Sequence, residues 1–281
     1  CMANNSLLIN VDIGETRVAL IEDGILGELY VERKRDRSPV GNIYLGKVTR
    51  VLPGMQAAFV DVGLDRAAFL HVEDLLPATD PTARTSSDED ESDLLDADDV
   101  DQKGQKGQEG RNRQAAAQSQ RVSRSTPIRE VVREGQNILV QVSKGPISTK
   151  GARVTAHVAL PGRYAVYMPT IDHVGVSKRI GKDEERKRLK EVIDAIKPPE
   201  GGVVVRTLAA GLTKKKLKSD IGYLVKVWEK TTEKQKTVKR APTLLYEEPD
   251  IILRTARDMF TEEISEIIID DPKEYQRLKE F

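Results

Sequence analysis

A series of short apolar segments separated by turn residues is the feature that most narrows the fold of this chain. The segments read as strands and lie near residues 43–51, 56–62, 66–71 and 137–142. Pro53-Gly54 and Gly63 separate the first three, and both residue types are typical of tight turns. Several short strands at this spacing favour a small closed barrel, and the OB-fold is a five-stranded barrel of this kind. We therefore expect an OB-fold barrel within an α+β protein.

The rest of the chain predicts strands and helices around that barrel. Asp23-Gly24 is a strong two-residue hairpin signal between strands at 18–22 and 25–31. The other candidates are strands at 7–11, 153–160, 163–169, 203–208 and 267–269, and helices at 183–196, 213–237, 249–260 and from 272 onward. Apolar residues recur every three or four positions in 213–237, which predicts one buried helix face, formed by Leu217, Ile221, Leu224, Val225 and Trp228. The chain ends inside the last helix without a cap, so we expect it to be a truncated piece of a longer protein.

Residues 78–126 lack any apolar periodicity. Positions 88–101 hold nine acidic residues in fourteen, and the stretch that follows is rich in Gln, Gly and Arg. Such a composition cannot bury enough apolar surface to offset chain entropy. We expect a disordered insertion that hangs from the barrel.

Charge and cysteine content exclude some classes of protein. The net charge is zero, but 78–126 holds 11 acidic and 7 basic residues, so the remainder is mildly basic, with 38 basic against 34 acidic side chains. The single cysteine, Cys1, is given no role and excludes a disulfide framework or a cysteine zinc site within the chain. No stretch approaches the ~20 apolar residues of a membrane span. These features fit a protein of the reducing cytoplasm.

Phe59 and Phe69 lie on adjacent predicted strands of the barrel. RNA-binding barrels stack bases on exposed aromatic rings, each stacked base contributing roughly 1–3 kcal/mol. Strict alternation places Phe59 on one face with Ala57 and Asp61, which is a poor core face. Taken alone, the pattern still favours core packing somewhat over stacking. Basic residues cluster further along the chain, a pattern that usually marks only a solvated surface: Lys144, Lys150, Arg153, Lys178 and Arg179.

Arg206 and Thr207 directly follow three valines that read as a buried strand. The end of such a strand is where open α/β sheets present ligand-binding groups. A planar guanidinium beside a hydroxyl suits a terminal phosphate. A structural ion pair explains the arginine equally well from these residues alone.

Two other kinds of site find little support. The segment VDIGETR at 11–17 is similar to the phosphate-binding D-x-G-x-T turn of actin-like ATPases, and Asp12 lies where an RNase-H-like fold keeps a metal-binding carboxylate. An ATPase of that class needs a second glycine-rich phosphate turn, which the sequence does not contain. His71, His157 and His173 are too widely separated to show the spacing of a metal-ligand pair.

Six segments, in order, resemble the ribonuclease E/G family, and more closely ribonuclease G than ribonuclease E. They are GNIYLGKVTRVLPGMQAAFVDVGLDRAAFLH, REGQNILVQVSK, TKGARVTAHVALPGRYAVYMP, HVGVSKRI, GGVVVRTLA and IGYLVKVW. The resemblance covers nearly the whole chain outside 78–126. It implies an RNase-H-like subdomain split between 2–39 and 220–281, an OB-fold barrel at 40–144 and a sensor of RNA 5′ ends at 145–219.

The same resemblance implies the role of individual residues. Phe59, Phe69, Lys144 and Lys150 match the positions that bind RNA. A second set matches the pocket for a 5′-monophosphate, formed by Gly162, Val166, Arg206 and Thr207. Asp12 lies in a subdomain that is structural in the family.

The parent protein implied by the resemblance is an Mg²⁺-dependent endoribonuclease. It cleaves single-stranded RNA, preferably 5′-monophosphorylated, in rRNA processing and mRNA decay, and it is a homo-oligomer. The family's two catalytic aspartates lie beyond the position that matches Phe281, so we expect this chain to bind RNA without cleaving it. The alternatives are a stand-alone RNA-binding protein that has lost the nuclease half and, less favoured, the actin-like ATPase.

Overall fold

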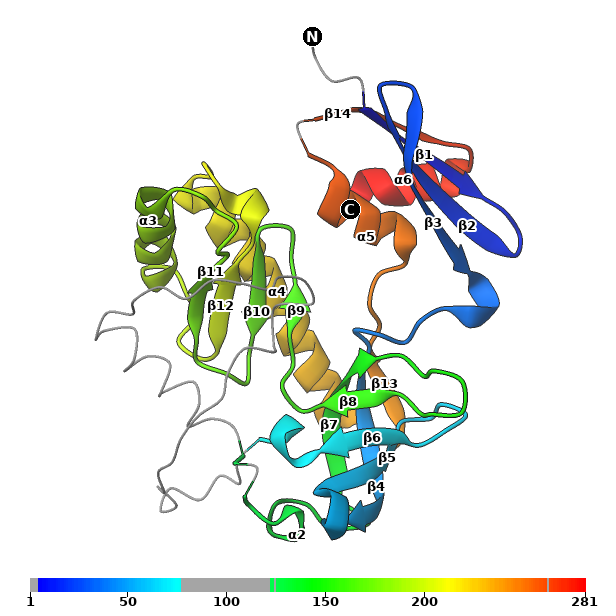
Figure 1. The fold of residues 1–281 in the computed structure, drawn as a ribbon, viewed down its shortest axis with the longest axis vertical. Coiled ribbons are helices and arrows are strands. Elements are labelled where there is room, and N and C mark those ends of the chain that lie inside the picture. The colour runs from blue at the N-terminus through cyan, green and yellow to red at the C-terminus, as the bar shows by residue number, and fades with distance from the viewer. Residues whose placement is uncertain (1–4, 77–121, 124, 262) are drawn as a thin grey trace.

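The computed structural model describes residues 5–76, 122–123, 125–261 and 263–281. It is a mixed α+β structure of three sheets, which Figure 1 shows as three separate groups of strands. Cys1 and most of the segment 78–126, for which we expected disorder, lie outside the described residues. No helix in the described ranges is long and apolar enough to cross a membrane.

Five strands close into the barrel drawn at the bottom of Figure 1. They are β4 (Ile43–Leu52), β5 (Ala57–Asp61), β6 (Ala68–His71), β7 (Asn137–Lys144) and β8 (Arg153–Thr155). The strands follow one another around the barrel in the order β4-β5-β6-β8-β7, and β7 pairs again with β4. All pairs are antiparallel except β6 with β8. This closed barrel is consistent with an OB-fold. A sixth strand, β13 (Thr243–Tyr246), pairs with the outer edge of β4.

The barrel interior is filled by alternate residues of its strands. Ala58 and Val60 of β5 and Ala68 and Leu70 of β6 are fully buried there. The short helix α2 (Ile128–Val131) packs against this core. Single 3₁₀ turns lie at residues 34–36, 53–55, 72–74 and 207–209 of the chain. Val122 also packs into this core, 7% exposed. The expectation of disorder across 78–126 is therefore wrong at Val122, because an apolar side chain anchors the end of the segment.

The second sheet carries two helices, and we call it the α3–α4 unit. Its strands, in spatial order, are β11 (Val174–Val176), β12 (Gly202–Val205), β10 (Ala165–Met168) and β9 (Leu160–Pro161). The helices are α3 (Asp183–Asp194) and α4 (Lys214–Thr237). The predicted apolar face of α4 packs into this unit's core, which confirms its structural role.

The single strand expected over 153–160 is interrupted. Its first part, β8, completes the barrel, whereas β9 belongs to the α3–α4 unit. Between them the side chain of Gln141 accepts from Ala159 N and donates to Ala159 O, which replaces strand pairing at that point. The range 40–144 predicted for the barrel thus leaves out β8, the strand that links β6 to β7 in the closed barrel.

The third sheet combines three strands from the start of the chain with one strand from near its end. We call this sheet and its two helices the α5–α6 unit. Its order is β14 (Ile264–Ile269), β1 (Asn5–Val11), β2 (Glu15–Glu22) and β3 (Ile25–Arg33). Helices α5 (Ile251–Met259) and α6 (Pro272–Glu280) pack against it around Leu7, Ile9 and Val18. Asp23 and Gly24 adopt φ values of 50° and 82°, as the predicted hairpin turn between β2 and β3 requires.

Candidate nucleic-acid interface

Phe59 and Phe69 lie side by side on the outer surface of the barrel. They are partners in the β5–β6 register, and their ring centroids are 6.3 Å apart in an edge-to-face arrangement. Their neighbours Ala58, Val60 and Leu70 fill the barrel core, so alternation turns both rings outward. The interpretation that favoured core packing is therefore wrong. Two half-buried aromatic rings on a barrel surface can receive stacked bases.

The strand register extends this pair into a row across all five barrel strands. Arg50 is the register partner of Phe59, Phe69 is the partner of Arg153, and Arg153 is the partner of Lys144. We call these five residues the outer row. The three basic side chains are exposed, and Arg153 also forms an ion pair of 2.9 Å with Asp74. An aromatic centre between cations matches a nucleic acid, whose bases stack while its phosphates attract positive charge.

Arg50 belongs to the outer row although the sequence did not single it out. A register shift in β4 between Val48 and Arg50 brings it opposite Phe59. Lys150 lies outside the row, at the end of a short turn that begins at Ile147. The next residue must be Gly151, since a Cβ there would lie 2.1 Å from the carbonyl oxygen of Ala67. This close packing fixes the turn, and with it Lys150, beside β6.

Arg206 makes its contacts at the end of β12. Its Nη1 donates to Gly162 O at 2.7 Å and to Asp258 Oδ1 at 2.5 Å, and its backbone N–H donates to Tyr164 O at 2.8 Å. The structural ion pair considered from the sequence is thus present. It uses one edge of the guanidinium only. In the part of the chain that the structure describes, no group accepts from Nε or Nη2.

Gly162 lies in a tight turn that a half-buried carboxylate holds. Asp220 of α4 accepts the backbone N–H groups of Tyr164 and Ala165, both at 3.0 Å, and that of Arg163 at 3.3 Å. A Cβ on Gly162 would lie 2.8 Å from Asp220 Oδ2, so the close approach requires glycine. Burial raises the pKa of Asp220 even though these three donors act to lower it. The carboxylate fixes the carbonyl of Gly162 toward Arg206.

The structure separates the other two predicted pocket residues from this contact. Val166 lies on β10 as the register partner of Val204, half-buried. The Thr207 hydroxyl lies 3.2 Å from that of Ser177 and faces a cavity of about 460 Å³. Arg179 and Lys182 also line that cavity, whereas Arg206 does not. The arrangement thus joins Arg206 to Gly162 and places Thr207 in an adjacent hollow, which Glu185 lines together with the two cations.

Asp258 belongs to a buried chain of ion pairs that the sequence did not indicate. Its Oδ2 lies 3.0 Å from Arg257 Nη2, and Arg257 Nη1 lies 2.7 Å from Glu248 Oε1 and 3.2 Å from Pro161 O. The Arg257 and Glu248 side chains are only 11% and 8% exposed. Glu248 N donates to Asn42 Oδ1, beside the barrel. Residues of all three units therefore lie around the ion pair between Arg257 and Glu248.

The pKa values of Asp258 and Arg257 shift in the directions that favour their charged forms. Burial acts to raise the pKa of Asp258, but the Arg257 and Arg206 guanidinium groups outweigh it and hold that pKa below its ordinary value. Burial acts to lower the pKa of Arg257, and its two carboxylate partners raise it instead. Both groups are ionised at neutral pH.

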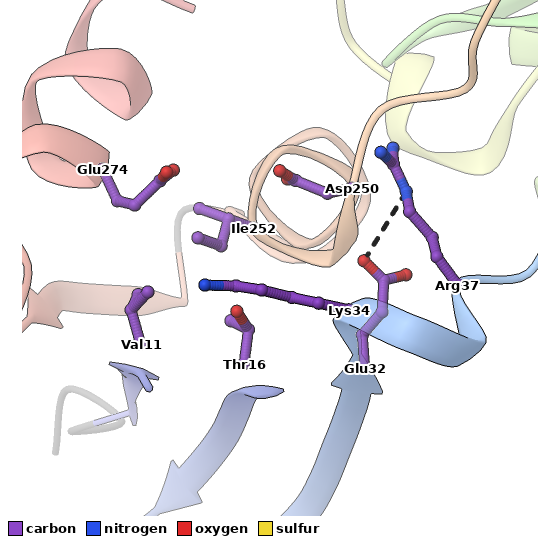
Figure 2. A pocket seen from close by; sticks show the side chains of 8 residues that line it. All are labelled: Val11, Thr16, Glu32, Lys34, Arg37, Asp250, Ile252 and Glu274. Carbon is purple, nitrogen blue, oxygen red and sulfur yellow. Dashed lines mark ion pairs between the residues drawn. The ribbon is translucent and has the colours of Figure 1, made fainter. Parts of the chain in front are cut away.

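A second cavity lies in the α5–α6 unit, beside the segment 11–17 that is similar to an ATPase turn. Figure 2 shows its lining, which encloses about 210 Å³: Val11, Thr16, Glu32, Lys34, Arg37, Asp250, Ile252 and Glu274. Its three carboxylates outnumber its two cations, Lys34 and Arg37, a balance that disfavours a nucleoside triphosphate. Asp12 is exposed and does not line it. Within the described ranges, no three His, Cys, Asp or Glu side chains lie together as a metal site requires.

Comparisons with known proteins identify the family. The family model for the ribonuclease E/G family matches residues 159–281. Ribonuclease G of Escherichia coli (strain K12) is 43% identical over 275 residues, 98% of this chain and 49% of that protein. The chain belongs to the ribonuclease E/G family. Ribonuclease G of Haemophilus influenzae is 40% identical over the same length and covers the same shares of the two chains.

Ribonuclease E proteins of this family are also similar, at lower identity. The ribonuclease E of Synechocystis sp. is 34% identical over 242 residues, 86% of this chain and 30% of that protein. The chain spans about half the length of the curated ribonuclease G relatives that it matches.

Proposed function

We propose that this chain binds single-stranded RNA and selects 5′-monophosphorylated ends, as the RNA-capturing part of an Mg²⁺-dependent endoribonuclease of RNA processing and decay. The outer row is the observation that carries the proposal. Its two aromatic rings would stack bases, and its cations would follow the phosphate backbone. The similar proteins are ribonucleases, which supports an RNA substrate.

The 5′-end selection is proposed for the contact between Arg206 and Gly162. The free edge of the guanidinium offers Nε and Nη2 in the fork geometry that suits two phosphate oxygens. Val166 and the adjacent Thr207 would complete the pocket. In this proposal the α3–α4 unit is the 5′-end sensor, and the discontinuous sheet of β1–β3 and β14 is the split RNase-H-like subdomain.

The whole protein's magnesium-dependent hydrolysis and homo-oligomeric state are proposed from the family alone, and the same holds for its cytoplasmic location. Among the described residues, no three His, Cys, Asp or Glu side chains form a group that could hold a metal ion, and no step of hydrolysis is assigned to these residues. Their proposed task is capture and orientation of RNA without cleavage.

Arg206→Ala tests the selection of 5′ ends. Wild type is expected to bind an RNA with a 5′-monophosphate more tightly than the same RNA with a 5′-hydroxyl, and the variant is expected to lose about tenfold or more of that preference. A hydrogen bond to a charged group contributes about 1.5–3 kcal/mol. Fluorescence anisotropy at one fixed salt concentration measures both affinities, because backbone binding depends steeply on salt.

Arg17→Ala is the matched control, since Arg17 lies on β2 and, among the described residues, pairs only with Glu15. Equal affinity of wild type for both RNAs would refute the 5′-end proposal while leaving RNA binding by the barrel intact.

Arg50 and Lys144 give a separate test of the outer row. The double variant Arg50→Ala/Lys144→Ala is expected to bind both RNAs more weakly, without changing their ratio. Each lost phosphate contact to a single strand reduces the slope of log affinity against log salt by about 0.7, so the pair should remove about 1.4. Titrations at four salt concentrations measure the slope, and an unchanged slope would show that these cations do not contact RNA.

A further inference from the structure

We infer that Asp258 is a positioning residue of the proposed 5′-phosphate site, holding one edge of the Arg206 guanidinium so that the other edge faces the ligand. This inference rests on the proposed function of Arg206. It adds a residue from the α5–α6 unit to a site that otherwise lies in the α3–α4 unit.

The first step of the argument is the division of donors on Arg206. Both hydrogens of Nη1 are used, one by Gly162 O at 2.7 Å and one by Asp258 Oδ1 at 2.5 Å. The remaining donors, on Nε and Nη2, meet no acceptor among the described residues. These are the two nitrogens that bind a phosphate side by side. Asp258 therefore contacts the edge of the guanidinium that a bidentate phosphate does not need.

The second step is the rigidity of Asp258 itself. Arg257 donates to both of its oxygens, from Nε at 3.2 Å and from Nη2 at 3.0 Å. Arg257 is in turn held by Glu248 and by Pro161 O. A long arginine side chain otherwise loses rotamer freedom when a ligand fixes it. The carboxylate of Asp258 orders Arg206 before the phosphate arrives.

The third step concerns charge. Asp258 brings a negative charge close to the position proposed for a dianionic phosphate, which by itself disfavours binding. The side chain of Arg257 is within hydrogen-bonding distance of Asp258 and offsets that charge. Glu248 pairs with Arg257 in turn, so the two arginines and the two carboxylates of this chain of ion pairs sum to zero. The brace thus orients Arg206 without adding an uncompensated negative charge beside the phosphate.

The test compares Asp258→Ala with Asp258→Asn in the full chain, using the same pair of 5′-monophosphate and 5′-hydroxyl RNAs. Asp258→Ala is expected to reduce the preference for the monophosphate about three- to tenfold, as the ordering of one long side chain implies. Asparagine retains an Oδ1 acceptor for Arg206 Nη1, so Asp258→Asn should keep most of the preference. Affinity for the 5′-hydroxyl RNA should not change in either variant.

Arg254→Ala is the matched control, because it removes another ion pair of α5, with Glu32 at 2.6 Å, without touching Arg206. An unchanged preference in Asp258→Ala would overturn the inference, and so would an increased one, which would make Asp258 a competitor of the phosphate. Equal loss of affinity for both RNAs would also overturn it, as a purely structural role. If Asp258→Ala does not fold, Asp258→Asn decides, since the inference requires a folded protein that retains the preference.

The failure of the inference and that of the proposed function are distinguishable. If wild type prefers the monophosphate and Arg206→Ala does not, the proposed function stands whatever Asp258 does. If wild type shows no preference, the proposed 5′-end site and the role of Asp258 fail together.

Discussion

Replacing both Phe59 and Phe69 by alanine is expected to weaken binding of a single-stranded RNA by about 30-fold or more. Each stacked base contributes roughly 1–3 kcal/mol, and even 2 kcal/mol in total corresponds to about 30-fold in affinity. The two rings are partners across β5 and β6 on the outer surface, so their removal leaves no cavity in the barrel core. Fluorescence anisotropy at constant salt measures the loss, and circular dichroism should show an unchanged fold.

Phe281→Ala provides the control, since Phe281 is an exposed phenylalanine away from the barrel. Phe59→Tyr provides a second control, because a tyrosine ring still stacks. The idea that this barrel captures RNA by stacking fails if the double variant binds as tightly as wild type, or if Phe281→Ala weakens binding equally.

Local patterns predicted much of the fold. The hairpin at Asp23-Gly24 is formed as expected, because its geometry depends on two residues that tolerate positive φ. The barrel strands near residues 43–51 and 56–62 were predicted from alternation and turn residues, which act over a few positions. The buried stripe of α4 follows from helical periodicity alone.

Features that depend on pairing between distant segments could not be predicted in this way. Residues 153–160 read as one strand, yet the pairing of β8 with β6 and of β9 with β10 divides them between two sheets. Arg50 reaches the outer row through a register shift that no local pattern marks. Val122 fills the barrel core from a segment whose composition is otherwise polar.

The candidate site shows the same limit. For Phe59, strict alternation indicated a poor core face, and the sequence still favoured core packing over stacking; the structure turns the ring outward, although the neighbouring Ala57 is buried. For Arg206 the sequence left a phosphate ligand and a structural ion pair open, and the structure contains the pair with Asp258, 52 positions away. Nothing in the residues around 257–258 signals that contact. The assignments of Gly162 and Val166 came from the family resemblance alone, and that of Thr207 came also from its place after the buried strand; all three stay predictions.

Arg257→Ala is expected to lower the free energy of unfolding by about 3–5 kcal/mol, because it leaves the buried carboxylate of Glu248 without its cation and removes one of the two arginines that pair with Asp258. Glu248 is 8% exposed, and among the described residues its carboxylate would keep only the Tyr246 hydroxyl, at 3.3 Å. Urea titration measures the change, with fluorescence of Trp228, the single tryptophan, reporting on the α3–α4 unit. Arg17→Ala, which breaks an exposed ion pair, should cost less than about 1 kcal/mol. A comparably small loss for Arg257→Ala would show that water screens the chain of ion pairs.

The difference in free energy of unfolding between wild type and Arg257→Ala should depend on pH through the carboxyl group of Asp258. Its pKa is lowered in the folded protein by Arg257 and Arg206, after burial has acted to raise it. The stabilisation is therefore fully present above the ordinary carboxyl pKa of about 3.9 and is lost as the pH falls through the lower folded value. Wild type and Arg257→Ala should converge in stability in acid. Because Arg257 also braces Asp258, the variant should lose preference for 5′-monophosphorylated RNA at neutral pH, which would link the junction of the three units to the proposed selection of RNA ends.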